Sequence, residues 1–180
     1  MKRLMFCLLL LTACKDETTM PSPVAMNAES TGYFCQMNIL EHPGPKAQIH
    51  LANYPGAPLF FSQVSDAVAY LQMPEQADTV TATYVSDMGA ATSWANPGET
   101  NWIAADTAMF VVGSSSKGGM DAPEFVPFSD LVKAQAFAAR NGGYVMSLAQ
   151  IPETSIASSS TPADTDFAAR LHALSNTSGD

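Results

Sequence analysis

The stretch GYFCQMNILEHPGPKAQIHL, residues 32–51, brings together side chains suited to binding a soft metal ion. Cys35 and Met37 are separated by one residue, and His42 and His50 follow within fifteen positions. Thiolate and thioether sulfur together select Cu(I) over hard cations. The alternative for Cys35 is a buried cysteine that packs as a small apolar residue. For both histidines the alternative is a packed or solvated imidazole.

Methionine is a second source of soft ligands, and Met120 stands out by its position. It lies in the glycine-rich stretch SSSKGGMDAPEF, where a large apolar side chain has no obvious core to join. A methionine in a loop packs poorly, but it is a mobile and polarizable ligand. Met88, in YVSDMG, is a further candidate as a ligand or as a residue lining the site. Met73, Met109 and Met146 lie in helix-like or strand-like stretches and are expected in the core.

The N-terminus has the pattern of a bacterial lipoprotein signal. The charged start MKR precedes an apolar run that is too short to span a bilayer, which needs roughly 20 residues. LTAC, residues 11–14, then matches the lipobox pattern. We predict a signal peptide over residues 1–13 and lipid on the sulfur of Cys14; a chance cysteine after an ordinary signal peptide is the alternative. Cys7 would leave with the signal, so Cys35 would have no disulfide partner.

The predicted anchor and the charge of the chain indicate where the protein resides and which partners it excludes. Acyl chains on Cys14 would tether it to a membrane on the periplasmic side, because each buried methylene contributes about 0.8 kcal/mol. Lys15, in place of aspartate, favours the outer membrane. Without Lys2 and Arg3 the chain keeps six basic residues against 17 acidic ones, a net charge of −11. A phosphate backbone would be repelled, so we predict no nucleic-acid partner.

Two stretches repeat one pattern at an offset of 67 residues. PLFFSQVSDAVAYL, residues 58–71, is similar to EFVPFSDLVKAQAFAA, residues 124–139, with the pair Phe-Ser at 61–62 falling on Phe-Ser at 128–129. Apolar residues recur at helical spacing in each stretch, and each serine is suited to cap the following helix. The second helix is expected to end at the NGG of residues 141–143, because glycine tolerates positive φ.

Runs rich in valine, threonine and aromatic residues flank both helices and predict strands. These runs cover residues 33–40, 47–52, 79–85, 101–106, 108–114 and 143–151. The predicted fold class is therefore α+β, a tandem duplication of a small ββαβ unit packed into one compact module. The predicted boundaries are a flexible tether at 14–31, units at 32–92 and 93–152, and a linker-like tail at 153–180 with a short helix at 165–174.

The expected strands would assemble the candidate ligands. Cys35 and Met37 would point to the same face of strand 33–40, because side chains alternate along a strand. If that strand forms a hairpin with strand 47–52, His50 would approach the two sulfur atoms. Met120 would reach them from the junction of the two units.

Residues 32–151 resemble the NosL family, the nitrous oxide reductase accessory lipoproteins, through GYFCQMNILEHPGPKAQIHL, YVSDMG, NWIAADTAMFVVGS, GGMDAPEFVPFSD and NGGYVMSL. The resemblance implies a tandem of small ββαβ domains and a copper chaperone. Such a chaperone would receive Cu(I) and pass it, with a membrane ABC-type maturation complex, towards the copper-sulfide cluster of nitrous oxide reductase. It also implies Cys35 and Met37 as the C-x-M pair and Met120 as the loop methionine. Asp121 stands where the family often has glycine.

The resulting hypothesis is one Cu(I) held by Cys35, Met37 and Met120, with His50 and Met88 as further candidate ligands. A flexible Met120 loop would release the ion while the ligands of a partner enter. Two other functions remain open. One is an enzyme that uses Cys35 on an organometal or thiol substrate, although no acidic partner or second cysteine is placed for it. The other is a structural or docking lipoprotein in which Cys35 is buried.

Overall fold

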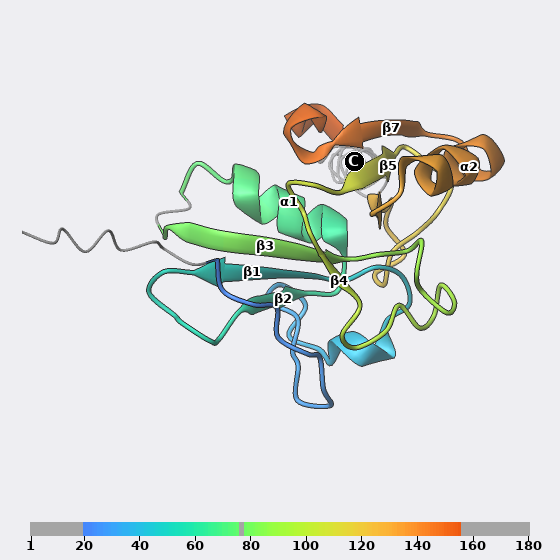
Figure 1. Cartoon of the computed structure of the whole chain (residues 1–180). Helices are drawn as coiled ribbons and strands as arrows, with labels where there is room; N and C mark the ends of the chain where they lie inside the picture. The colour runs from blue at the N-terminus through green and yellow to red at the C-terminus, as the bar shows by residue number, and fades with distance from the viewer. Residues whose placement is uncertain (1–19, 76–77, 156–180) are drawn as a thin grey trace, which may run out of the picture.

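The computed structural model describes residues 20–75 and 78–155 of the 180-residue chain, and these form an α+β structure of two antiparallel sheets (Figure 1). One sheet has four strands in the order β2-β1-β3-β4, and the other has three in the order β6-β5-β7. The signal peptide, the lipidated Cys14 and the helix predicted at 165–174 lie outside the described residues. None of the helices in the described part is long and apolar enough to cross a membrane.

The first sheet is built around β1 (Ala47–Leu51), which pairs with β2 (Leu59–Phe61) on one side and β3 (Val80–Ser86) on the other. β4 (Trp102–Ala104) pairs antiparallel with β3 at the edge of this sheet. The odd-numbered residues of β1 join the core with helix α1 (Val64–Gln72), whose apolar residues recur at helical spacing. The even-numbered residues point to the other face, since strand side chains alternate.

The second sheet contains β5 (Met109–Val112), β6 (Val126–Phe128) and β7 (Tyr144–Ser147), with helix α2 (Leu131–Asn141) packed against all three. Two short 3-10 helices, η1 (Ile39–Glu41) and η2 (Leu148–Gln150), complete the described elements. The order strand, strand, helix, strand thus occurs twice. The offset of 67 residues relates β2 to β6 and the first residue of α1 to that of α2.

One hydrophobic cluster joins the two halves of the molecule. Core residues of α1 and the first sheet pack with Phe110 and Val112 of β5, Phe125 before β6, and Ile151 after η2. α1 lies between the first sheet and the second ββαβ segment (Figure 1). A smaller cluster fills the space between the second sheet and α2. Burial of each large apolar side chain contributes about 1.5–3 kcal/mol, so the shared cluster couples the stability of the two halves.

The first predicted strand is wrong. Residues 33–40 form a turn followed by η1, and Gln36 has a left-handed φ of 56°. The hairpin predicted between this segment and β1 is therefore also absent, because β1 pairs with β2 and β3. β2 and β6 were not predicted as strands. The strand predicted at 101–106 is present in part as β4, but it joins the first sheet, not the second.

The predicted serine caps are also wrong by one residue. The N-cap of α1 is Gln63, which makes no side-chain capping bond, and the N-cap of α2 is Asp130, whose carboxylate accepts from two backbone amides. The chain is still leaving strands β2 and β6 at Ser62 and Ser129, so both serines precede the first helical turn. The predicted end of α2 is confirmed, with Gly142 at the C-cap and a φ of 75°.

The predicted flexible tether is wrong for residues 20–31. Met26 is 1% exposed, and its amide donates to the carbonyl of Glu99. Val24 exchanges two hydrogen bonds with the side chain of Gln48, at 2.8 and 2.9 Å. The hydroxyl of Tyr84 donates to the carbonyl of Pro21. These contacts cover the face of the first sheet opposite α1, and they explain why polar residues of β1 are buried.

Candidate metal site

Cys35 lies in a tight turn that is closed by its own backbone. The amide of Gly32 donates to the carbonyl of Met37 at 2.9 Å, and the amide of Gln36 donates to the carbonyl of Gly32 at 2.8 Å. The sulfur of Cys35 lies 3.9 Å from the carbonyl oxygen of Met37 and 3.0 Å from the hydroxyl oxygen of Ser62. A turn, not a strand, therefore brings the cysteine and the following methionine together.

Gly32 is required for this arrangement. A Cβ at that position would lie 2.5 Å from the sulfur of Cys35 and 2.8 Å from the hydroxyl oxygen of Ser62, closer than real carbon contacts allow. The thiol is half-buried, and the side chain of Met37 is 40% exposed. The turn thus presents the thioether of Met37 near the surface and keeps the thiol of Cys35 half-buried.

Met120 lies at the tip of a loop between Lys117 and Pro123, which are joined by an isolated bridge. The amide of Asp121 donates to the carbonyl of Gly118, which closes a β-turn around Met120. Asp121 has a φ of 59°, a conformation that glycine adopts more readily. This conformation agrees with the glycine that the resemblance leads one to expect there.

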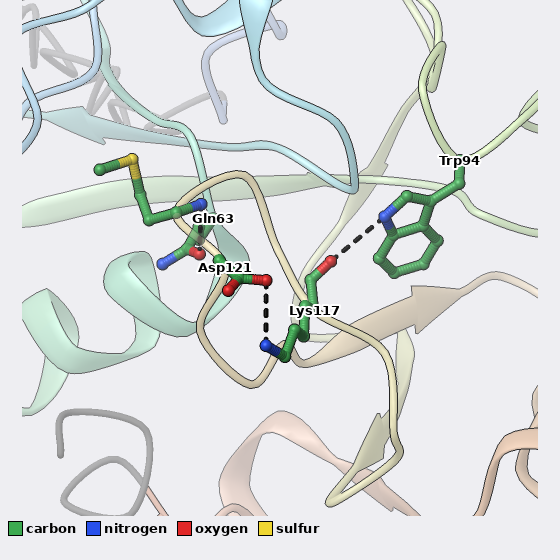
Figure 2. Close-up of polar contacts among 5 residues, drawn as sticks. Gln63, Trp94, Lys117 and Asp121 are labelled. Atoms are coloured by element: carbon green, nitrogen blue, oxygen red, sulfur yellow. Dashed lines mark hydrogen bonds and ion pairs between the residues drawn. The ribbon is translucent and has the colours of Figure 1, made fainter. Parts of the chain in front are cut away.

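The backbone of this loop is anchored to the rest of the protein. Figure 2 shows the ion pair between Lys117 and Asp121, at 3.0 Å, and the indole of Trp94 donating to the carbonyl of Lys117 at 3.2 Å. The amide of Met120 donates to the side-chain oxygen of Gln63 at 2.9 Å. The side chain of Met120 is nevertheless 44% exposed. The flexibility predicted for the loop is therefore better assigned to the thioether side chain.

The histidine that contacts the Met120 loop is His42. Its Nδ1 lies 3.1 Å from the carbonyl oxygen of Gly119, while its Nε2 is buried without a hydrogen-bond partner. A Cβ on Gly119 would lie 2.5 Å from the Cβ of His42, so this loop passes very close to the histidine.

His50 and Met88 are placed away from these contacts. His50 lies towards the far end of β1 from Ser62, where its Nε2 is 2.9 Å from the side-chain oxygen of Gln48 and its ring packs against Tyr84. It lines a separate cavity of about 530 Å³ with Leu51, Tyr54 and Val80 among others. Burial lowers the pKa of His50. Met88 packs against the cluster beneath α2.

Two buried charged groups lie behind the candidate ligands. Lys46 is 1% exposed, and its ammonium donates to the carbonyls of Pro43 and Gly44. Burial lowers the pKa of Lys46 to about 8, although its attraction to Glu124 and Cys35 acts in the opposite direction.

Glu124 is also 1% exposed, and it belongs to the segment that follows the Met120 loop. One carboxyl oxygen accepts from the amides of Ser65 and Phe125, both at 2.9 Å. Burial raises the pKa of Glu124 to about 8, against the effects of these two amides and of Lys46. Because Ser65 is in the first turn of α1, Glu124 supplies the helix cap that Gln63 does not provide.

The residues that contact the candidate ligands carry little signal in the sequence. The repeat marks Ser62, but as a helix cap, and no pattern predicts a role for Lys46, Gln63 or Glu124. Nothing in the spacing of Gln63 or Glu124 indicates their contacts, which span 57 and 59 residues.

The candidate donors Cys35, Met37 and Met120 are all sulfur ligands. Cys35 contacts Ser62, and the amide of Met120 contacts Gln63, the two residues that precede α1. Within residues 20–75 and 78–155, no group of three or more His, Cys, Asp and Glu side chains is arranged to hold a metal ion. The chemistry available to this arrangement is therefore coordination of a soft ion by a thiolate and thioethers.

Comparisons with known proteins agree on one family. The NosL family model matches residues 23–156. The copper-binding lipoprotein NosL of Achromobacter cycloclastes is 51% identical, with 96% of this chain and 93% of the relative covered, and that of Stutzerimonas stutzeri is 31% identical, with 79% and 74% covered. The crystal structure of the copper chaperone NosL from Shewanella denitrificans matches with a TM-score of 0.69 at 31% identity, covering 74% of this chain and 97% of that one. The chain belongs to the NosL family.

Proposed function

We propose that this protein is a Cu(I) chaperone, anchored by lipid on Cys14 to a membrane on the periplasmic side, more specifically the outer membrane. The names of its relatives, copper-binding lipoprotein and copper chaperone, support the cargo and the anchor. The observation that carries the proposal is the pairing of a half-buried thiol with thioethers that are 40% and 44% exposed. Donors near the surface suit transfer of an ion, whereas a storage site would enclose it.

Transfer of the ion follows from the unequal anchoring of its ligands. The Cys35 thiolate provides affinity, while Met37 and Met120 are soft and uncharged donors. Because the backbone of the Met120 loop is anchored while its side chain is 44% exposed, we expect its thioether to leave the ion while a ligand of the recipient enters. The recipient that we propose, from the family resemblance, is the maturation pathway of nitrous oxide reductase, including its ABC-type complex.

The replacement Met120→Leu tests the site directly, because leucine keeps the size of the side chain and removes its sulfur. We expect Cu(I) affinity to fall at least about tenfold, the equivalent of about 1.4 kcal/mol. An anaerobic titration against a chromogenic Cu(I) chelator would measure this effect. Met73→Leu is the matched control, since Met73 is 41% exposed at the end of α1 and lies outside the site. Equal affinities of the two variants would contradict the role of Met120.

The surface around the site offers apolar contacts to a recipient. Large apolar side chains that are at least 37% exposed gather in the segment that carries Cys35, namely Tyr33, Phe34, Met37 and Leu40. We expect Leu40→Asp to lower nitrous oxide reductase activity in cells while Cu(I) affinity in vitro stays unchanged, because a buried charge penalises docking. Val132→Asp, on α2 at 71% exposure, is the control. Full reductase activity in the Leu40→Asp strain would exclude this surface.

A further inference from the structure

We propose that Ser62 and Gln63 form a clamp that sets the spacing between the two halves of the copper site. Ser62 holds the Cys35 sulfur, and Gln63 holds the backbone of Met120. The inference rests on the proposed function, since it assumes that Cys35 and Met120 bind one Cu(I). It assigns a positioning role to two neighbouring residues that do not themselves coordinate the ion.

Ser62 is fitted closely to the thiol. Its side chain is 2% exposed, and its hydroxyl oxygen lies 3.0 Å from the Cys35 sulfur. Because Gly32 has no side chain, there is room for the Ser62 hydroxyl and the Cys35 sulfur to make this contact. A hydroxyl in this position can donate to a thiolate, and a hydrogen bond to a charged group is worth about 1.5–3 kcal/mol. Ser62 therefore fixes where the Cys35 sulfur lies.

Gln63 uses its side chain across the protein and not on its own helix. It occupies the N-cap of α1, where a side chain commonly accepts from the first helical turn, yet it makes no such bond. Glu124 satisfies the helix, as described above, and this leaves the amide of Gln63 for other contacts. Its oxygen accepts from the amide of Met120 at 2.9 Å. This bond ties the backbone of the Met120 loop to the N-cap residue of α1.

The loop is shaped to accept this contact. A Cβ on Gly118 would lie 2.7 Å from the side-chain oxygen of Gln63, so only glycine lets the loop pass this close. Because Ser62 and Gln63 are adjacent, their Cα atoms are about 3.8 Å apart across one planar peptide. The segments that carry Cys35 and Met120 are distant in the sequence, and each is thus held by one of two residues that share a rigid peptide unit. Such preorganisation lowers the ordering cost of binding.

The test uses the full-length lipoprotein in detergent, with anaerobic Cu(I) competition titrations and X-ray absorption to count sulfur neighbours. Ser62→Ala and Gln63→Leu each remove one arm of the clamp. Ser65→Ala is the matched control, because Ser65, in the first turn of α1, is also 2% exposed but its hydroxyl has no hydrogen-bond partner. We expect each clamp variant to weaken Cu(I) binding about tenfold, the effect of one lost hydrogen bond to the site, and Ser65→Ala to leave binding unchanged.

Double variants that combine Ser62→Ala or Gln63→Leu with Met120→Leu distinguish a positioning role of each residue from a general loss of stability. Gln63 acts through Met120, so Gln63→Leu should have no further effect in the Met120→Leu background, and alone it should remove one sulfur neighbour. Ser62 acts through Cys35, so Ser62→Ala should keep its full effect in that background. If Ser62 and Gln63 had a purely structural role, Ser62→Ala and Gln63→Leu would each lower Cu(I) affinity by the same factor with and without Met120→Leu.

Several results would overturn the clamp. These are wild-type affinity in Ser62→Ala or Gln63→Leu, or an unchanged effect of Gln63→Leu after Met120 is replaced. Gln63→Glu keeps an acceptor for the Met120 amide, so loss of a sulfur neighbour in that variant would also contradict it, even if Gln63→Leu failed to fold. If Met120→Leu alone had no effect, the proposed copper site would be wrong; an effect of Met120→Leu without one of Gln63→Leu would reject only the clamp.

Discussion

Replacement of Cys35 with serine is expected to lower Cu(I) affinity by at least about a thousandfold, equivalent to roughly 4 kcal/mol. Within the described part of the chain Cys35 carries the only thiol, and a serine hydroxyl is neutral and hard where a thiolate is anionic and soft. Serine is the sharper test than alanine, because its hydroxyl can keep a hydrogen bond to Ser62, which lies 3.0 Å from the sulfur. The variant should therefore fold normally and lose only the metal.

The measurement is an anaerobic Cu(I) titration of the wild type and Cys35→Ser, with a thermal unfolding curve for each in the absence of copper. Equal melting temperatures together with loss of binding would assign the effect to the sulfur. Retention of stoichiometric binding at wild-type affinity would reject the site and would favour a structural lipoprotein. If Cys35 acted as an enzymatic nucleophile instead, the wild type would turn over a thiol or organometal substrate without binding copper stoichiometrically.

The helices and most of the central strands could be predicted from the sequence because their signals are local. The offset of 67 residues aligns the first residues of α1 and α2, where apolar spacing repeats. The strand predicted at residues 33–40 is wrong because Tyr33, Cys35, Met37 and Ile39 alternate in the sequence as they would in a strand. Two features outweigh this pattern: Gln36 adopts a left-handed conformation, and the turn is closed by backbone bonds from Gly32. β2 and β6 are three residues each, too short to show a period.

The candidate ligands could be proposed from residue chemistry, but their assembly could not. Cys35 and Met120 are related through Ser62 and Gln63, whose contacts span 27 and 57 residues. Neither contact follows from periodicity or composition. The first depends on how the turn around Cys35 packs against the end of β2, and the second on how the second ββαβ segment packs against α1. His50 was expected near the thiol only through the hairpin with segment 33–40. Once that strand is absent, His50 remains on β1 with Gln48 as its partner.

The stability of the protein should pass through a minimum near pH 8 because of Glu124 and Lys46. The folded-state pKa of Glu124 is raised from 4.5 to about 8, so the folded state holds a proton that the unfolded state has released over this range. Stability should therefore fall as pH rises from about 5 to 8, by up to about 1.4 kcal/mol per pH unit. The pKa of Lys46 is lowered from 10.5 to about 8, so stability should rise again above pH 8.

Urea unfolding across this pH range, compared between the wild type and Glu124→Gln, measures the contribution of the buried carboxyl group. Glutamine keeps an oxygen that can accept from the amides of Ser65 and Phe125, so the cap of α1 is preserved. At pH 5 both side chains are neutral and the two proteins should be similarly stable, which serves as the internal control. At pH 8 the variant should be the more stable protein, because residue 124 no longer holds a proton that the unfolded chain releases. Parallel curves for the two proteins would show that Glu124 titrates in the folded state as it does in the unfolded chain.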